Sequence, residues 1–471
     1  MIYTMRLGID FGTTNTSAAV FDGETLVYIP LDPRNGSEYN LRSMIYVDAH
    51  HHVRLGVDAV QTFLREDTGR PVVLEEKVVG TIENTVASQG FETGEQGGPI
   101  TIIYDVHVNE DVGIRGRLLQ SIKTGLRSSA YRGTKIFGRF YTVEELIAAI
   151  LRHVRQRSEA YLGQPVQAAL IGRPVIFSDD PAEDRLAEEK MRRAARLAGF
   201  AEIDFLPEPL AAAAFYVNRT PRAQTLLVFD FGGGTLDLTV IKVHAGEVQG
   251  VQQEVLSAVG VLVGGDDLDS AIMRGKVAPY FGTESAIDVN FDGRLVPFPE
   301  PLAQLLEQWQ TIPALTRPEN LPIIKRGIQY GNDRAAFQAL ETLATQNYGF
   351  ALFQAIEQAK RELSEADAAT IQLQVGDFQL AAKLARIEFN RLIGYEQAEV
   401  RRGIREVVAA AGLQPQQVDV VVATGGSSSI PAFQALLRHE LPGAELVISD
   451  IFGSVTGGLA IQAYRQQPVS A

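Results

Sequence analysis

Two short segments of this 471-residue chain have nearly the same sequence although they lie far apart. The first is Ile9-Asp10-Phe11-Gly12-Thr13-Thr14-Asn15, and the second is Phe229-Asp230-Phe231-Gly232-Gly233-Gly234-Thr235-Leu236-Asp237. Each follows an apolar run typical of a β-strand, turns on glycine and small hydroxyl residues, and continues into a second such run. Because a repeated strand–turn–strand unit indicates an internal duplication, we expect two related lobes with a cleft between them.

The chemistry of these two turns predicts a site for a phosphorylated ligand. A tight glycine turn exposes consecutive backbone N–H groups, and such a concave surface attracts phosphate oxygens. Asp10 and Asp230 lie at the ends of the preceding strands, where a carboxylate is well placed to hold the water shell of Mg²⁺. Either turn alone is also explained as a glycine hairpin without a ligand. Three consecutive glycines, Gly232–Gly234, cost conformational entropy, however, and indicate a close approach of the backbone. Two facing turns would clamp one polyphosphate, so we expect a nucleotide site.

A third glycine-rich segment has the sequence Thr424-Gly425-Gly426-Ser427-Ser428-Ser429-Ile430-Pro431. It lies between the predicted strand Val418–Ala423 and a helix that begins near Pro431. Glycines here would let a base or ribose approach the backbone, and the helix N-terminus adds N–H donors. The alternative is a plain strand-to-helix turn that needs left-handed backbone geometry.

The hydrophobic pattern between these motifs predicts an α/β fold. Thr142–Leu162 carries the apolar stripe of an amphipathic helix, with Thr142 and Glu145 as a capping box. The other predicted elements are the strands Val166–Ile171, Ile203–Leu206 and Val248–Val251, the helix Pro181–Ala198 ended by Gly199, and the helix Tyr395–Ala411 ended by Gly412.

Two regions fit this repeated core poorly, and we interpret them as inserted subdomains. The first insertion is residues 39–132, with short strands and Gly-rich turns such as Ser88–Pro99, and the second insertion is residues 266–382, which is mostly helical. The core of lobe I is then residues 1–38 and 133–225, and the core of lobe II is residues 226–265 and 383–471.

Composition excludes several classes of function. The formal net charge of −14 argues against a broad nucleic-acid interface, which needs a concentrated basic face. The absence of cysteine excludes disulfides, thiolate catalysis and cysteine-ligated metals. We see no leader and no apolar run long enough to span a membrane, so we expect a cytoplasmic protein without a membrane partner. The run His50-His51-His52 is interpreted as a polar turn rather than a metal site.

Taken in order along the chain, these motifs resemble those of the actin-like ATPase superfamily, and the connecting segments resemble the heat shock protein 70 family specifically. The segments that carry this closer likeness are Ala160-Tyr161-Leu162-Gly163, Leu170-Ile171-Gly172-Arg173-Pro174, Leu206-Pro207-Glu208-Pro209-Leu210-Ala211-Ala212-Ala213, Gly264-Gly265-Asp266-Asp267-Leu268-Asp269 and Glu357-Gln358-Ala359-Lys360-Arg361-Glu362-Leu363-Ser364. The resemblance implies the duplicated actin-like, ribonuclease H-like fold, with ATP or ADP, Mg²⁺ and K⁺ as cofactors.

The resemblance also implies a role for each matching residue. Asp10 and Asp230 would hold the waters of Mg²⁺, and Glu208 would orient a metal-bound water. Lys123 would contact the γ-phosphate and the attacking water, with Lys135 as a weaker alternative. Thr235 would lie near the γ-phosphate, and Asp237 near the attacking water or a second cation. The residues implied to bind phosphates or adenosine are Gly12, Thr13, Thr14, Asn15, Gly232, Gly233, Gly234, Gly264, Gly265, Glu357, Lys360, Arg361, Ser364, Gly425, Gly426, Ser427 and Ser429.

Two departures from the family pattern matter. Ser429 stands where these chaperones have an arginine that stacks on adenine, so we predict weaker ATP binding. The segment Ile451–Val455 lacks the usual acidic pair. The chain also ends soon after the last predicted helix, so we expect a short, chaperone-like ATPase without a peptide-binding domain, regulated by protein partners similar to co-chaperones. Pro174 matches the proline that couples the nucleotide site to the partner-binding face.

Three functions remain open from the sequence. The first is Mg²⁺-dependent ATP binding and slow hydrolysis, used as a conformational switch. The second is a small-molecule kinase on the same fold, with Asp237 as its base. The third is a scaffold that binds a nucleotide without turnover.

Overall fold

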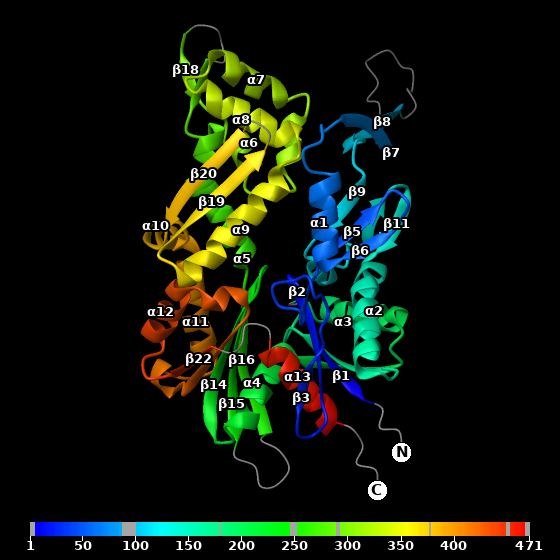
Figure 1. The fold of residues 1–471 in the computed structure, drawn as a ribbon, viewed down its shortest axis with the longest axis vertical. Coiled ribbons are helices and arrows are strands. Elements are labelled where there is room, and N and C mark those ends of the chain that lie inside the picture. Colours follow the sequence, from blue (N-terminus) through cyan, green and yellow to red (C-terminus); the bar gives the residue numbers. More distant parts are fainter. Residues whose placement is uncertain are drawn as a thin grey trace, which may run out of the picture.

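The computed structural model describes residues 5–86, 100–178, 180–244, 252–288, 293–375, 378–448 and 453–466. In Figure 1 the molecule forms two halves that lie side by side, and the first strand, β1, and the last helix, α13, both lie in the lower part of the molecule. The predicted turns in Ser88–Pro99 and the predicted strand Val248–Val251 lie outside the described residues, as does the start of the Ile451–Val455 segment.

Two five-strand paths with the same topology form the cores of the two halves. The first runs in the order β3-β2-β1-β12-β13 and the second in the order β16-β15-β14-β21-β22. In each, three consecutive strands pair antiparallel, and two later strands add in parallel beside the first of them. The first set is β1 (Arg6–Phe11), β2 (Asn15–Phe21), β3 (Leu26–Tyr28), β12 (Ala168–Arg173) and β13 (Glu202–Pro207). The second set is β14 (Gln224–Phe231), β15 (Leu236–His244), β16 (Gln252–Val261), β21 (Val420–Thr424) and β22 (Glu445–Ile448). The predicted duplication is confirmed.

Helices cover these sheets where the hydrophobic periodicity predicts them. Helix α2 (Val143–Leu162) begins after Thr142, and the predicted capping box with Glu145 is present. Helix α3 (Pro181–Ala198) packs against α2 and ends at Gly199, whose φ of 99° is readily adopted only by glycine. In the second half, α11 (Gly394–Ala410) occupies the position corresponding to α2, and α12 (Pro431–Glu440) the position corresponding to α3.

Two further helices, α4 (Glu208–Arg219) and α13 (Ser454–Arg465), pack against each other between the sheets (Figure 1). Glycine permits this close approach, because a Cβ on Gly458 would lie 1.8 Å from the carbonyl oxygen of Ala211. Helix α13 also packs against β1 and β2 of the first sheet, although it follows the strands of the second sheet in sequence. The two lobes are therefore joined through a helix pair, and the predicted domain boundaries remain predictions.

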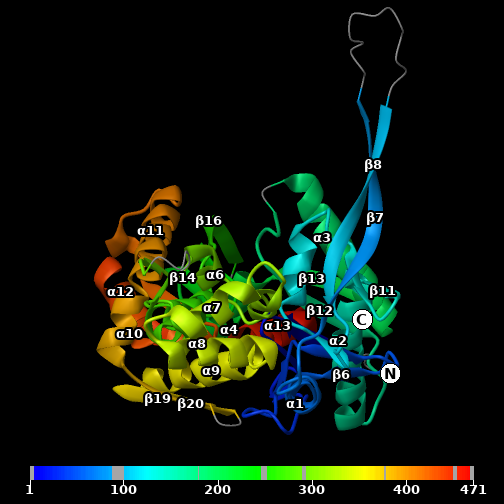
Figure 2. The same cartoon turned by 90° about the horizontal axis from the view of Figure 1, so that it is seen from above.

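The first insertion adds a small sheet, a helix and a long hairpin. Strand β4 (Asn40–Arg42) pairs with β2, and α1 (Gly56–Glu66) packs on the three-stranded sheet β6-β5-β9. The strands of that sheet are β5 (Ile45–Asp48), β6 (Val53–Leu55) and β9 (Gly116–Leu119). The histidine run occupies the turn between β5 and β6, as predicted. Strands β7 (Leu74–Val86) and β8 (Ile100–Asp111) form an antiparallel hairpin that extends away from the body of the molecule in Figure 2.

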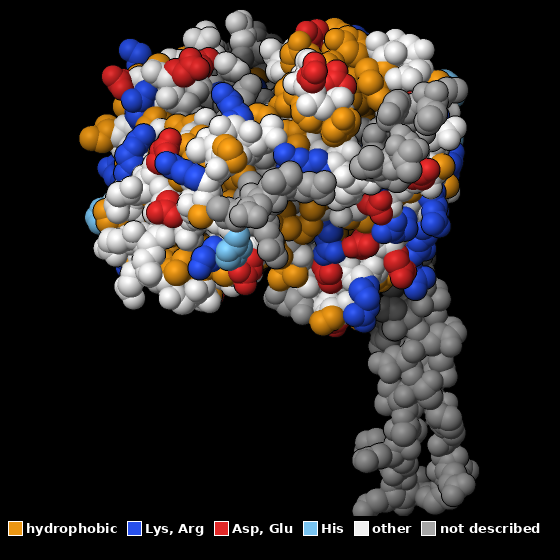
Figure 3. Space-filling model, turned by 90° about the horizontal axis from the view of Figure 1, so that it is seen from below, with side chains coloured by type: hydrophobic (Ala, Val, Ile, Leu, Met, Phe, Trp, Pro, Cys, Tyr) orange, Lys and Arg blue, Asp and Glu red, His pale blue; other side chains and the backbone are white. Residues whose placement is uncertain are grey.

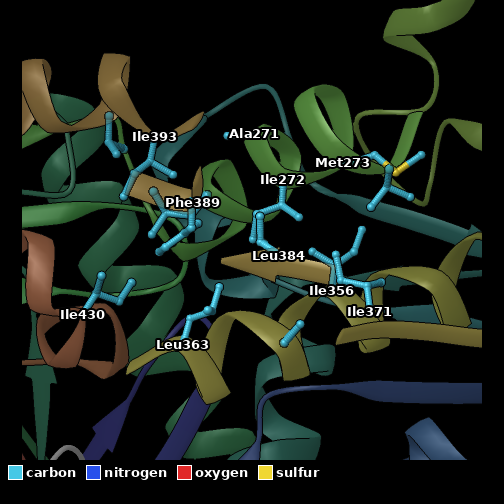
Figure 4. Packing of buried hydrophobic residues seen from close by; sticks show 14 of the residues in the cluster. Ala271, Ile272, Met273, Ile356, Leu363, Ile371, Leu384, Phe389, Ile393 and Ile430 are labelled. Carbon is cyan, nitrogen blue, oxygen red and sulfur yellow. The ribbon is translucent and has the colours of Figure 1, made fainter. Parts of the chain in front are cut away.

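The second insertion is a helical region with one hairpin. Its main elements are α5 (Gly265–Ile272), α6 (Glu300–Gln304), α7 (Leu321–Tyr330), α8 (Arg334–Thr345), α9 (Gly349–Glu365), β19 (Ala368–Val375) and β20 (Phe378–Ala385), followed by α10 (Arg386–Leu392). Ile356 and Leu363 of α9 point into an apolar core shared with Ile371 of β19 and Leu384 of β20 (Figure 4). This packing fixes the rotation of α9 and leaves its other face toward the cleft.

Two surface observations bear on partners. Acidic and basic side chains are interspersed on the face drawn in Figure 3. Among the described residues, every helix is too short or too polar to cross a lipid bilayer.

Candidate nucleotide site

A cavity of about 910 Å³ lies between the two lobes and the two insertions. Of the residues singled out from the sequence, those that line it are Asp10, Gly12, Thr13, Thr14, Asn15, Lys123, Pro174, Glu208, Asp230, Gly232, Gly233, Gly234, Thr235, Asp237, Gly265, Glu357, Lys360, Arg361, Ser364, Gly425, Gly426, Ser427 and Ser429. Gly264 is not among the lining residues: it precedes α5, and its N–H donates to Asp267. The fold thus gathers residues from eight separate segments at one place, while their individual roles remain predictions.

The floor of the cavity is built by the two glycine turns, which share one backbone geometry. In the first turn, Gly12–Asn15, the Gly12 N–H donates to the Asn15 carbonyl at 2.9 Å. In the second turn, Gly232–Thr235, the Gly232 N–H donates to the Thr235 carbonyl at 2.9 Å. The turns lie against each other, because a Cβ added to Gly233 would come within 2.0 Å of Thr14 Oγ1. Facing turns of this kind can present N–H groups to one anionic ligand from two sides.

The third glycine segment lies beside the second turn. Gly425 has φ of 81°, and a Cβ there would lie 2.4 Å from the Phe231 carbonyl oxygen and 3.0 Å from Asp230 Oδ1. Glycine is therefore required both by the backbone conformation and by the close approach of β14. The hydroxyl of Ser429 donates to the Gly426 carbonyl at 2.8 Å, so its side chain folds back onto its own turn.

Buried carboxylates gather beside the two turns. Burial raises the pKa of Asp10 to about 7, with the charge of Glu208 adding to the effect and that of Lys123 opposing it. Burial likewise raises the pKa of Asp230 well above its ordinary value, reinforced by Glu208, Asp237 and Asp10. The charge of Asp10 thus acts on Asp230, and both carboxylates line the same cavity. Several negative charges in a shielded site need a positive counterpart.

Lys123 supplies one such counterpart. Its Nζ donates to Glu208 Oε1 at 2.7 Å, and both side chains are almost buried. Burial acts to lower the pKa of Lys123, but the attraction of Glu208 and Asp10 outweighs it and raises that pKa. Lys123 is therefore a fixed cation at the site.

The remaining negative charge fits a divalent cation held through water. Within the described residues, no group of three or more histidine and carboxylate side chains is arranged to ligate a metal directly. Mg²⁺ usually keeps several waters and takes only one or two protein carboxylates. Asp10 and Asp230, both lining the cavity, suit that mode of binding.

The α9 face of the cavity is already hydrogen-bonded. Lys360 Nζ donates to the Gly265 carbonyl at 2.7 Å and to Asp269 Oδ2 at 2.8 Å. Glu357 accepts hydrogen bonds from Arg42 at 3.0 and 3.2 Å. Arg361 lies 3.6 Å from Glu357 and keeps 58% of its side-chain surface exposed, so it is available to a flat ligand at the cavity mouth.

Sequence reasoning missed several residues that the structure brings to the cavity. Arg42 reaches it from β4, and Trp309 and Phe350 from the second insertion. Arg127 also lines the cavity, and its Nη2 donates to Thr235 Oγ1 at 3.4 Å. Of these residues, only Arg127 could have been found from the sequence, because it lies one short helical turn beyond Lys123. Whether Arg42, Trp309 and Phe350 reach the cavity depends on how the insertions fold.

Aromatic side chains join the two insertions above the cavity. The ring centroids of Phe63 from α1 and Phe350 from α9 are 5.3 Å apart. Trp309 lies 5.9 Å from Phe63 and 5.0 Å from Phe350, and its Nε1 donates to Gln120 at 3.3 Å. We call Phe63, Trp309 and Phe350 the aromatic bridge, because they connect the two lobes over the site.

Comparison with protein families agrees with this architecture. The family model for Hsp70 protein matches residues 118–297 and 338–464, which together are more than half of the chain. The matched segments contain Lys123, the second turn, the cavity face of α9 and the third glycine segment, whereas the first turn precedes them. The duplicated sheets are those of the actin-like ATPase fold. The chain belongs to the Hsp70 family.

Proposed function

We propose that this chain binds ATP with Mg²⁺ in the cavity, hydrolyses it slowly, and uses the nucleotide state as a chaperone-like conformational switch. Membership of the Hsp70 family implies ATP binding, ATPase activity and chaperone-like activity in general. The observation that carries the finer proposal is the convergence of two facing glycine turns on a cluster of largely shielded carboxylates that includes the Glu208–Lys123 ion pair.

The two turns hold the triphosphate in this proposal. Their N–H groups, with the hydroxyls of Thr13 and Thr14, bind phosphate oxygens from opposite lobes. Asp10 and Asp230 hold waters of Mg²⁺, which neutralises phosphate charge when bound. Because each lobe supplies one turn, a triphosphate favours the closed arrangement of the lobes.

Hydrolysis depends on residues at the inner end of the cavity. Lys123, held by Glu208 at 2.7 Å, places positive charge at the γ-phosphate, where catalysis of phosphoryl transfer relies on positioning and charge. Asp237 lines the same end of the cavity and is assigned to orient the attacking water. The adenosine lies between α9 and the third glycine segment, with Arg361 against the base.

A chain of contacts links the cavity to helix α3 on the outer surface of the first lobe. Pro174 lines the cavity, and the adjacent Arg173 forms ion pairs with Asp184 and Glu188 of α3 at 2.8 and 2.6 Å. Closure of the lobes would shift α3 through these contacts, and protein regulators of the co-chaperone type would read that shift.

ATPase measurements on the wild type, two variants and a control variant test the proposal. The wild type should hydrolyse ATP in a Mg²⁺-dependent reaction, and Lys123→Ala and Thr235→Ala should each lower kcat by about 100-fold, the cost of one transition-state charge contact. Lys135→Ala is the matched control, because Lys135 is exposed and does not line the cavity. Binding without turnover in the wild type would instead indicate a scaffold. Turnover that requires an added sugar or other alcohol would indicate a kinase.

A further inference from the structure

The short helix η1 (Ile122–Arg127) presents two cations to the cavity rather than one. Lys123 and Arg127 both line the cavity. Each directly follows a buried apolar residue, Ile122 or Leu126, that packs into the core of the first lobe. The spacing between Lys123 and Arg127 equals the spacing between Ile122 and Leu126. Packing of these two apolar side chains therefore holds both cations in place on one short helix.

The two cations differ in what balances their charge. Lys123 is paired with Glu208 at 2.7 Å. The contact of Arg127 is with a neutral group, because its Nη2 donates to Thr235 Oγ1 at 3.4 Å. In the part of the chain that the structure describes, the Arg127 guanidinium forms no ion pair with a carboxylate. A guanidinium in this state is free to take a bidentate oxyanion, which matches its planar fork of donors.

Arg127 lies near Asp237 and the second glycine turn. Burial raises the pKa of Asp237, and the positive charge of Arg127 acts in the opposite direction, so the two groups lie within electrostatic reach. Thr235, which Arg127 contacts, belongs to the second turn. Arg127 therefore reaches from the first lobe to the turn of the second lobe where the end of a bound triphosphate would lie.

The segment that follows Arg127 is held by side chains of α3. Lys190 of α3, only 6% exposed, donates to the carbonyls of Ser128 at 3.1 Å and Tyr131 at 3.3 Å. Ser129 donates to Glu183 of α3 at 2.8 Å. These contacts limit the loss of side-chain and loop freedom that binding would otherwise cost, which is how a preorganised catalytic group is supported.

We propose that Arg127 contacts the γ-phosphate of bound ATP and acts with Lys123 as a second catalytic cation, an inference that rests on the proposed function. In the reaction, the oxygen of water forms a bond to the γ-phosphorus, and the bond from that phosphorus to the β–γ bridging oxygen breaks. The electron pair leaves with ADP, one water proton stays on the phosphate, and the other passes to solvent. Arg127 stabilises the negative charge on the γ-phosphoryl oxygens as they separate from ADP.

Arg127→Ala, with Arg132→Ala as its matched control, tests this role. Arg132 is an exposed arginine that does not line the cavity. We expect Arg127→Ala to lower kcat by about 100-fold, the usual cost of one such donor, and to weaken binding of ADP with aluminium fluoride by a similar factor. Its affinity for ADP alone should be unchanged, because ADP has no γ-phosphate. Added guanidinium ion should restore part of the activity of Arg127→Ala.

Arg127→Gln distinguishes a loss of positive charge from a loss of stability, because glutamine keeps a donor for Thr235 and removes the positive charge. It should show the same kinetic loss with the melting temperature of the wild type. Unchanged kcat and analogue affinity in both variants would overturn the inference, as would a parallel loss of ADP affinity and thermal stability. If the wild type binds ADP with aluminium fluoride but does not hydrolyse ATP, the proposed hydrolysis is wrong, and the analogue affinities still decide whether Arg127 contacts the phosphate.

Discussion

The first turn of the cavity floor carries two threonines where the second turn carries two glycines, although both backbones bend in the same way. The hydrogen bond that closes each turn is 2.9 Å long in both. The difference follows from their contact, since a Cβ on Gly233 would lie 2.0 Å from Thr14 Oγ1. The two turns therefore share one main-chain conformation. Their side chains differ because Thr14 of the first turn occupies the space that a side chain on Gly233 would need.

The floor and the roof of the cavity differ in a second way. The floor comes from strands that have a counterpart in the other lobe. The roof comes from the two insertions, which have different folds and meet through the aromatic bridge. A floor made of repeated strands is suited to holding the phosphates, whereas the roof can adapt without disturbing either sheet.

The largest effect is expected from a substitution that disrupts the fit between the two turns. Gly233→Ala should weaken ATP binding by roughly 100-fold, near the upper end of the about 1–3 kcal/mol that overpacking costs, because its methyl group meets Thr14. Gly234→Ala is the control, since its nearest contact would be an ordinary 3.5 Å to Thr13. The double change Gly233→Ala with Thr14→Ala relieves the clash but also removes the Thr14 hydroxyl assigned to the phosphates. Its affinity in an equilibrium binding measurement should therefore exceed that of Gly233→Ala and stay below that of the wild type. Equal losses in the two single variants would show that the turns do not touch as described.

The next effect concerns the roof. Trp309→Ala removes two aromatic contacts, each worth about 0.5–1.5 kcal/mol, and should speed ADP dissociation about tenfold because the insertions separate more easily. Stopped-flow displacement of a fluorescent ADP analogue measures the rate. Phe140→Ala is the control, since that ring is 52% exposed and outside the cavity. A dissociation rate equal to that of the wild type would mean that the aromatic bridge does not limit opening.

A smaller effect tests the adenine side of the cavity. The Ser429 hydroxyl folds back onto Gly426, so it offers no stacking surface. Ser429→Arg should tighten ATP binding about two- to fivefold, from the about 0.5–1 kcal/mol of a cation–π contact at an exposed site. Calorimetric titration with ATP measures the change, and Ser429→Gln controls for size without charge. A sub-micromolar dissociation constant in the wild type would contradict the premise that its adenine is weakly held.

The last effect concerns stability rather than binding, and it is a pH dependence of unfolding from the second lobe. Burial raises the pKa of Asp269 to about 7, against the opposing charge of Lys360, from an ordinary 3.8. The native state then keeps a proton that the unfolded state loses, so the free energy of unfolding falls as pH rises from about 4 to about 7. Asp269→Asn should reduce that slope in denaturant titrations of the nucleotide-free protein. Asp367→Asn, at an exposed carboxylate, should leave it unchanged.

Much of the fold could be predicted from the sequence because its signals are local. The helix Pro181–Ala198 was predicted with both ends correct, since proline at the start and glycine at the end act within one turn of the chain. The capping box at Thr142 needed only residues three positions apart. The duplicated turns also carry their own geometry, because glycine spacing limits how such a segment can bend.

The candidate site was predicted less evenly. Glycine motifs identified its floor, but Arg42 and Trp309 lie in insertions whose folding depends on contacts far along the chain. The engagement of Lys360 by Asp269 likewise depends on how α9 packs against α5. No periodicity in the sequence indicates such pairings.

The sequence by itself determined that two similar glycine turns exist and that strands and helices alternate around them, because strand, turn and cap preferences act over a few residues. Only the tertiary structure decided which turn leaves room for the other, which cation contacts a hydroxyl group, and which aromatic rings connect the lobes. Those outcomes depend on the excluded volume and charge of groups that meet only after the chain has folded. Here Gly233 lies too close to Thr14 to carry a side chain, and Arg127 donates a hydrogen bond to Thr235.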